Sequence, residues 1–228
     1  MTSRRGPSGT GTLAFIQAEL EVIYGVEAPR VERFLLGGDA ARAAGRDPRA
    51  PEELLVLEDE EGVSLGLYLD EQILEAAAGA DPHDPRPRLT ARGSLARLAC
   101  AAEGISHYLY VTIRARAGLP VSLLELEVQA EIDKFALLVL HLWRRRLRRM
   151  SPALRRRLFE RVRYHAHLDV EALHRYREAN RLGGGYARWL EGRFVSEADL
   201  DGLLRELRRS YRLGGREKLG YLGTRTIQ

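Results

Sequence analysis

The chain has 228 residues, of which 45% are hydrophobic, enough for one sizeable core or for one core with a small appended unit. The formal net charge is +4, and arginine supplies 34 of the 36 cationic residues because Lys134 and Lys218 are the only lysines. No run of about 18 apolar residues could span a membrane. The single cysteine, Cys100, excludes an internal disulfide framework and a cysteine-rich zinc site. With no apolar segment after the charged N-terminus to form a signal peptide, we expect a cytoplasmic protein.

The first 80 residues predict a small α+β unit. We expect residues 1–12 to be a disordered tail, and the spacing of apolar residues predicts a helix over 13–24, ended by Gly25. Two runs with strand character, 53–59 and 63–70, flank a turn at Gly62 and predict a β-hairpin. The rest of this unit, 13–80, is expected to hold a helical turn at 29–36, a loop or frayed helix at 39–51, and a short helix to about 78.

A proline-rich segment, 81–91, predicts a linker, and helical periodicity follows it. The stretch 95–113 is apolar on almost every side as a helix, which predicts a buried position. The next helix, 123 to about 148, starts with a capping box at Ser122, and a long apolar stripe favours helix over the rival strand reading.

Further helices are expected to begin at Ser151, where a long third helix would carry Val162 and His165 on its apolar face, at Asp169, and at the segment from Ser196 to Asp199. In the fourth of these helices, Gly183–Gly185 would allow a close helix crossing or a local break. We therefore predict a mainly α protein, with a bundle of four to five helices over 92–212 and a loosely ordered tail over 213–228.

Three pairs of acidic and histidine residues have helical spacing. Helical bundles that hold two metals use Glu and Glu-x-x-His ligands from several helices, and such ligands suit Fe, Mn or Zn. The alternative, which we favour, is a buried polar network that fixes helix packing. The candidate metal ligands are Glu103 and His107, Glu127 and Glu131, and Glu171 and His174.

The segment from Trp143 to Arg163 holds ten arginines among 21 residues. Such a cluster can bind nucleic-acid phosphates, an anionic membrane or an acidic protein. The simplest alternative is a solvated surface paired with acids elsewhere in the chain. The Arg144–Arg163 face is therefore a candidate binding surface.

One pair of residues that begins in this segment and extends past it resembles the signature of a known family. Arg161 and His167 resemble, in spacing only, the Arg and His signature of the HEPN class of helical-bundle ribonucleases. The resemblance covers these two residues and no other part of the chain. It implies that the histidine acts as general acid or base while the arginine stabilises a phosphorane. The candidate catalytic residues are therefore Glu103, His107, Arg161 and His167.

Several catalytic motifs are absent from the sequence, among them the Walker A loop, G-x-G-x-x-G, H-E-x-x-H and G-x-S-x-G. The leading hypothesis is accordingly a binding protein: an adaptor, a regulatory subunit or a ligand sensor, with a protein partner or a homo-oligomer. One alternative is an enzyme with a divalent metal held by glutamate and histidine. The other is a nucleic-acid-binding protein or HEPN-like ribonuclease that uses the Arg144–Arg163 face.

Overall fold

The computed structural model describes residues 10–60, 62–78, 94–162, 164 and 168–226, and it confirms a mainly α fold with one β-hairpin. The chain divides into two compact units. The first holds the chain up to Glu21 and from Glu27 to Ala115, and the second holds Val22–Val26 and the chain from Arg116. The predicted linker at 81–91 lies outside the described residues. Among the described residues, the boundary between the two units instead falls at the end of the long helix Ser94–Arg116, which we expected to be the first helix of the bundle. No helix among the described residues is both long and apolar enough to cross a membrane.

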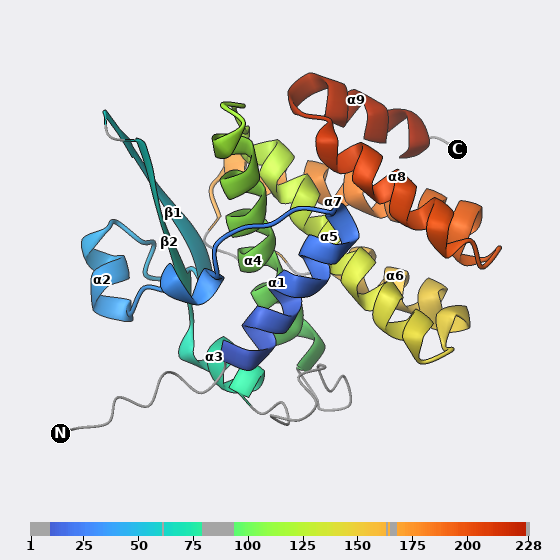
Figure 1. The fold of residues 1–228 in the computed structure, drawn as a ribbon, viewed down its shortest axis with the longest axis horizontal. Helices are drawn as coiled ribbons and strands as arrows, with labels where there is room; N and C mark the ends of the chain where they lie inside the picture. Colours follow the sequence, from blue (N-terminus) through green and yellow to red (C-terminus); the bar gives the residue numbers. More distant parts are fainter. Residues whose placement is uncertain (1–9, 61, 79–93, 163, 165–167, 227–228) are drawn as a thin grey trace. The chain divides into compact units, whose positions relative to one another are not determined.

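The first unit contains the predicted hairpin, drawn as two long arrows in Figure 1. Its strands pair from Glu52 opposite Leu69 to Asp59 opposite Gly62, whose φ of +132° suits a glycine turn. The elements of this unit are α1 (Thr10–Tyr24, whose last turn belongs to the second unit), η1 (Val31–Arg33), α2 (Gly38–Ala43), β1 (Glu52–Asp59), β2 (Gly62–Leu69), α3 (Glu71–Ala78) and α4 (Ser94–Arg116). Helix α1 thus begins inside the segment predicted as a tail, of which 1–9 lie outside the description.

Helix α4 packs within the first unit, which explains where the division falls. The Tyr108 hydroxyl donates to the Pro29 carbonyl at 2.8 Å, and the Tyr108 and Phe34 rings lie 5.0 Å apart. At Gly104 an added Cβ would stand 3.1 Å from Leu67 of β2, so the hairpin approaches the helix backbone closely. The helix is buried as predicted, but it does not belong to the bundle predicted over 92–212, because its partners precede it in the chain.

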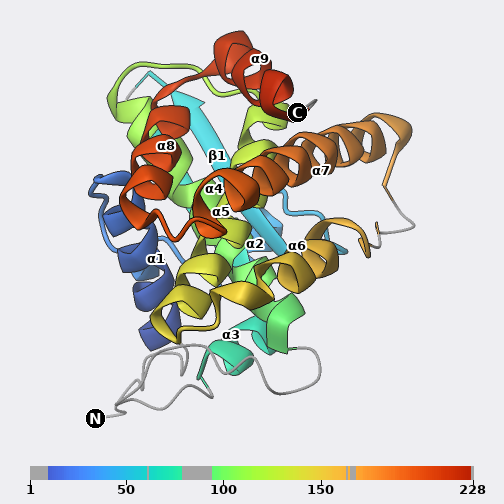
Figure 2. The same cartoon turned by 90° about the vertical axis from the view of Figure 1, so that its right-hand side faces the viewer.

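The second unit is a helical bundle built around α7, the long helix at the centre of Figure 2. Helix α7 contacts α5, α6 and α9, and α8 contacts α9. The elements are α5 (Leu123–Arg144), η2 (Arg148–Met150), α6 (Ser151–Phe159), α7 (Val170–Leu190), the π-turn η3 (Glu191–Val195), α8 (Leu200–Arg212) and α9 (Gly215–Thr226).

Two predicted helix starts of this unit, at Ser122 and Asp169, are confirmed by their caps, and the fifth helix, α8, has its cap at Asp199, the end of the segment predicted to open it. Ser122 Oγ accepts from the Glu125 amide at 3.2 Å, and Asp169 Oδ1 accepts from the Ala172 amide at 2.7 Å. The segment after Ser122 is therefore helix rather than strand, although it ends at Arg144 instead of about 148.

The glycines of α7 make the close crossing that their small size predicts, and the helix runs through them without a break. A Cβ on Gly183 would lie 2.6 Å from the Glu131 Cβ on α5, and a Cβ on Gly184 would lie 3.1 Å from Phe159 on α6. Only glycine lets three helices approach this closely.

Two predictions for this unit were wrong. Helix α6 ends at Phe159, so it is not the long helix expected to carry Val162 and His165; Val162 follows it and is exposed, and His165 lies outside the described residues. The segment predicted as a loose tail contains α9. Two of its residues, Lys218 and Leu222, are fully buried, so packing against α7 compensates for a glycine-rich sequence with a weak helical pattern.

Candidate functional site

The Glu103 and His107 pair lies on α4, in the first unit, and a third side chain joins it. His107 is 6% exposed, and its Nδ1 lies 3.2 Å from Oε1 of Glu52, the first residue of β1. A carboxylate oxygen of Glu103 and a ring nitrogen of His107 lie within 4.8 Å of each other. Glu103 and His107, which the sequence predicted to share one face of a helix, therefore lie close together in the structure.

Gly104 explains how Glu52 reaches this face of α4. A Cβ at Gly104 would stand 2.9 Å from the Cγ of Glu52, so a larger residue would push the hairpin away from the helix. Sequence reasoning missed Glu52, because β1 offers several acidic residues and nothing in the pattern tells which of them faces a helix 55 positions further along the chain.

The other predicted metal ligands lie in the second unit and do not form a site there. Glu127 is 7% exposed, with Arg175 Nε 3.7 Å away, and Glu131 accepts from Lys134 Nζ at 3.0 Å. Both carboxylates therefore have cationic neighbours. Glu171 and His174 are exposed in the first turns of α7. Within the described part of the second unit, no three metal-ligating side chains converge.

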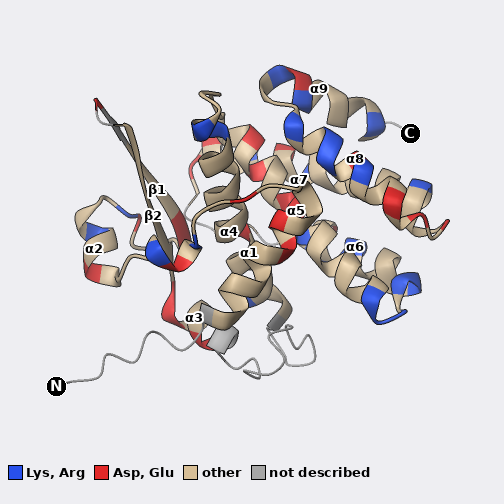
Figure 3. Cartoon of the chain, in the orientation of Figure 1, with Lys and Arg blue, Asp and Glu red and all other residues tan. Residues whose placement is uncertain are grey.

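The arginine-rich segment divides into paired and exposed residues. Arg155 is structural, because its Nε donates to Glu191 at 3.0 Å and its Nη1 donates to Glu160 at 3.1 Å. By contrast, no described carboxylate lies within 4 Å of Arg145, Arg146 or Arg149. Figure 3 shows blue residues gathered where α5 passes into α6. We define the arginine face as the exposed residues Arg144, Arg145, Arg146, Arg149, Arg156 and Arg157.

One residue of the arginine face has an unfavourable backbone conformation. Arg146, the second residue after α5, has φ +60°, and its amide donates to the Trp143 carbonyl at 2.9 Å. Glycine usually occupies this position after a helix, because a side chain in the left-handed region costs about 1–2 kcal/mol. Arg146 therefore occupies its position at a cost in stability.

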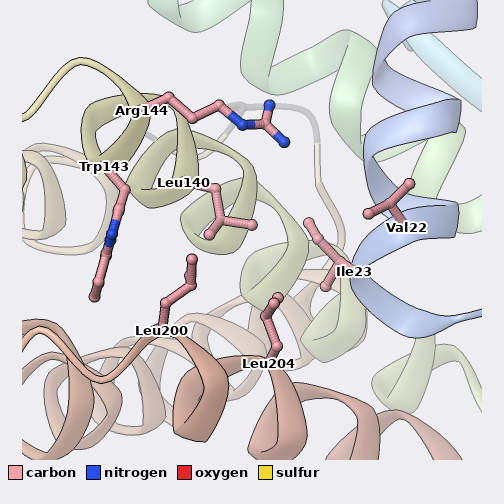
Figure 4. A pocket seen from close by; sticks show the side chains of 7 residues that line it. All are labelled: Val22, Ile23, Leu140, Trp143, Arg144, Leu200 and Leu204. Atoms are coloured by element: carbon pink, nitrogen blue, oxygen red, sulfur yellow. The ribbon is translucent and has the colours of Figure 1, made fainter.

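An apolar pocket of about 90 Å³ opens beside the start of the arginine face, within the second unit. Arg208 of α8 links this helix to the last turn of α1, because its guanidinium donates to the carbonyls of Ile23 at 2.9 Å and Val22 at 3.1 Å. Figure 4 shows aliphatic side chains converging, with the Trp143 indole on one side and the Arg144 guanidinium at the edge. The lining residues are Val22, Ile23, Leu140, Trp143, Arg144, Leu200 and Leu204.

This pocket could not be predicted from the sequence, because its walls come from the last turn of α1, the end of α5 and the start of α8. The predicted Arg161 and His167 pair is not placed. Arg161 is exposed just after α6, and His167 lies outside the described residues. The resemblance to HEPN ribonucleases therefore stays a prediction.

One polar cluster of the second unit is enclosed in its core. Gln129 donates to Asp133 Oδ1 at 2.7 Å and accepts from Lys218 Nζ at 2.5 Å, while the Tyr24 hydroxyl donates to Asp133. Burial, followed by the charge of Asp133, raises the pKa of Tyr24 well above its usual value. Since these side chains are at most 2% exposed, the cluster stabilises the unit and offers no surface to a ligand.

Comparison of the chain with protein-family models, with curated proteins and with solved structures finds no match. The features of this protein that bear on its function are consequently the arginine face, the pocket and the cluster around His107.

Proposed function

We propose that this protein is an adaptor or regulatory subunit whose second unit binds an acidic segment of a partner protein. The observation that carries the proposal is the position of Arg144, which belongs both to the arginine face and to the apolar pocket. A segment with an apolar side chain beside several carboxylates would satisfy both surfaces at once.

Electrostatics supports an acidic partner. The second unit holds 24 Lys and Arg against 14 Asp and Glu, a net charge of +10. A surplus of this size attracts acidic chains at long range, and guanidinium groups bind carboxylates through paired hydrogen bonds. Arg145, Arg146 and Arg149 have no described carboxylate within 4 Å, so a partner can supply one without breaking an existing pair.

The pocket favours a protein over a nucleic acid. An apolar cavity of about 150 Å³ holds a benzene molecule, so the present cavity of about 90 Å³ suits a smaller aliphatic group such as the side chain of Val or Leu. Leu147 and Met150, which lie between the arginines, are 43% and 53% exposed and add apolar surface. The phosphates of a nucleic acid would bind the arginines but would leave the apolar pocket and the exposed side chains of Leu147 and Met150 without a partner.

The backbone conformation of Arg146 also supports a binding role for the arginine face. Unfavourable backbone conformations persist where surrounding structure or function maintains them. A glycine would complete the turn after α5 at lower cost, but it would remove one guanidinium from the arginine face.

The test uses two defined acidic polymers of equal length, poly-glutamate and a random copolymer of glutamate and leucine. The protein carries Trp189→Phe, so that Trp143 in the pocket wall is its only tryptophan and reports occupancy by fluorescence. Burial of one leucine contributes about 1.5–3 kcal/mol, so we expect the copolymer to bind about 10 to 100 times more tightly. Rising salt should weaken both complexes.

Three sets of variants separate the parts of this surface. Leu204→Glu should abolish the advantage of the copolymer, since it places a charge in the pocket. Reversal of Arg145, Arg146 and Arg149 to Glu should abolish both complexes. The matched control reverses the exposed residues Arg205, Arg212 and Arg216 to Glu, with the same change of charge but outside the arginine face.

Two results would overturn the proposal. A mixed-sequence single-stranded oligonucleotide that binds more tightly than either polymer, independently of Leu204, would assign the arginine face to nucleic acid. Equal loss of polymer binding in the control triple variant would show that only net charge matters and that the arginine face is an ordinary solvated surface.

A further inference from the structure

We propose that Glu103 and His107 bind a divalent first-row transition metal in the first unit, with Glu52 as the residue that positions the histidine. This site is independent of the arginine face, which lies in the second unit. Glu103 and His107 are the ligands, and Glu52 acts only through His107.

The hydrogen bond to Glu52 gives His107 the form that a metal requires. Nδ1 of His107 lies 3.2 Å from the Glu52 carboxylate, which when ionised can only accept, so the neutral imidazole that donates from Nδ1–H carries its lone pair on Nε2. Metal-binding histidines commonly donate their second nitrogen to a carboxylate in this way, which fixes the ring and makes the other nitrogen more basic.

The distances and the enclosure suit a cation. A metal about 2.0–2.2 Å from a histidine nitrogen and a carboxylate oxygen holds these two atoms within roughly 4.4 Å of each other. A carboxylate oxygen of Glu103 and a ring nitrogen of His107 lie within 4.8 Å of each other, so a small rotation of the side chains brings both residues onto one ion. His107 is 6% exposed and the Glu52 side chain 10% exposed, so the charges interact with little solvent screening.

The donor set selects the class of metal. One imidazole with carboxylate oxygen suits Zn, Fe or Mn, whereas Ca and Mg prefer all-oxygen sites. Two protein ligands leave the remaining positions to water or to a small anionic ligand. Gly104, between the two ligands in sequence, is needed because it lets the Glu52 side chain lie against α4.

The test measures binding of the metal itself. The full chain, purified with a tag that contains no histidine and without chelators, is analysed for metals and titrated with Zn(II), Mn(II) and Co(II). We expect about one metal per chain, a Co(II) absorption band in the visible range, and a melting temperature that rises with metal concentration. His107→Gln and Glu103→Gln should abolish all three signals.

Glu52→Gln is the informative variant, because it separates positioning from coordination. It should keep the stoichiometry of one metal but weaken the affinity about 10- to 100-fold, as expected for the hydrogen-bond partner of a ligand. The matched control is Glu171→Gln with His174→Gln, which changes the same residue types on the exposed start of α7 and should leave binding unchanged.

Loss of metal in His107→Gln together with native circular dichroism supports the site. Glu103→Gln, at a partly exposed position, keeps the proposal testable if His107→Gln fails to fold. Less than about a tenth of a metal per chain, with no Co(II) band and no change in melting temperature, would overturn the proposal and leave Glu52 and His107 as a buried structural pair. Retention of metal in both ligand variants would overturn it equally. Polymer binding by the second unit is a separate measurement, so either proposal can fail alone.

Discussion

The two units of this protein differ in the sign of their charge and in the chemistry of their buried polar groups. The first holds 12 Lys and Arg against 18 Asp and Glu, a net charge of −6, while the second has +10. The whole-chain value of +4 conceals this separation. It teaches that the overall charge of a chain with two units says little about what either unit binds.

The buried polar groups also differ. In the first unit a carboxylate meets an imidazole, because Oε1 of Glu52 lies 3.2 Å from Nδ1 of His107. In the second unit carboxylates meet phenols: Glu206 accepts from Tyr186 at 2.9 Å and from Tyr221 at 2.6 Å. Such pairs respond to alkali rather than to mild acid.

Alkaline pH should give the largest contrast between the units. Burial, together with the carboxylate beside each hydroxyl, raises the pKa of Tyr24 and Tyr186 well above 10 and that of Tyr221 to about 12. These phenols keep their protons in the folded state while the unfolded chain loses them near pH 10, so stability is intact below pH 10 and falls as pH rises toward 12.

The emission of Trp143 and Trp189, both in the second unit, should therefore report unfolding above pH 10. Hydrogen exchange measured by mass spectrometry follows the first unit in the same sample. In Tyr221→Phe the stability of the second unit should fall less steeply as the pH rises. Emission unchanged between pH 9 and pH 12 would contradict this prediction.

Asp133→Ala should be the most damaging of the single substitutions considered for the second unit. It removes the acceptor of the Tyr24 hydroxyl and of the Gln129 amide, and each buried donor left without an acceptor costs about 1–3 kcal/mol. We expect the free energy of unfolding to fall by about 3 kcal/mol, measured by urea denaturation with tryptophan emission. Tyr24→Phe is the smaller control, because it removes one neutral hydroxyl, which donates to Asp133 and accepts from the Gln129 amide at 3.1 Å. Equal losses in both variants would show that the cluster does not act through Asp133.

Glycine substitutions should destabilise each unit separately. Gly104→Ala places a methyl group 2.9 Å from Glu52 Cγ, and Gly183→Ala places one 2.6 Å from Glu131 Cβ. Each should cost about 1–2 kcal/mol in spite of the better helix propensity of alanine. Hydrogen exchange should show the effect in the first unit for Gly104→Ala and in the second for Gly183→Ala.

The control for both is Gly220→Ala in α9, where nothing lies within 4 Å of the new methyl group. This variant should gain about 0.5–1 kcal/mol from helix propensity alone. A loss of stability in this control would mean that alanine is unfavourable at helical positions of this protein for a reason other than contact.

Arg146→Gly should have the smallest effect on stability and the opposite sign. The left-handed conformation at φ +60° suits glycine, so the second unit should gain about 1 kcal/mol. Binding of the glutamate and leucine copolymer should weaken at the same time, because the arginine face loses a guanidinium. A variant that gains stability with undiminished binding would remove Arg146 from the proposed interface.

Local patterns in the sequence determined much of the secondary structure. The Ser122 and Asp169 caps, the glycine turn at Gly62 and the long stripe of α5 each place their own polar groups and apolar side chains within a few residues. These features depend on neighbours along the chain, so the sequence alone contains them. The pair of Glu103 and His107 was visible for the same reason, since one turn of helix brings them together.

Tertiary structure decided what depends on distant partners. Helix α9 forms because Lys218 and Leu222 are buried, and a glycine-rich segment gives no sign of that burial. The pocket needs Val22 beside Leu140 and Leu204, and His107 meets Glu52 across 55 positions. Helical periodicity tells which side of a helix is apolar but not which element covers it. The elements of this protein therefore follow from its sequence, whereas its two candidate sites follow from the packing of those elements.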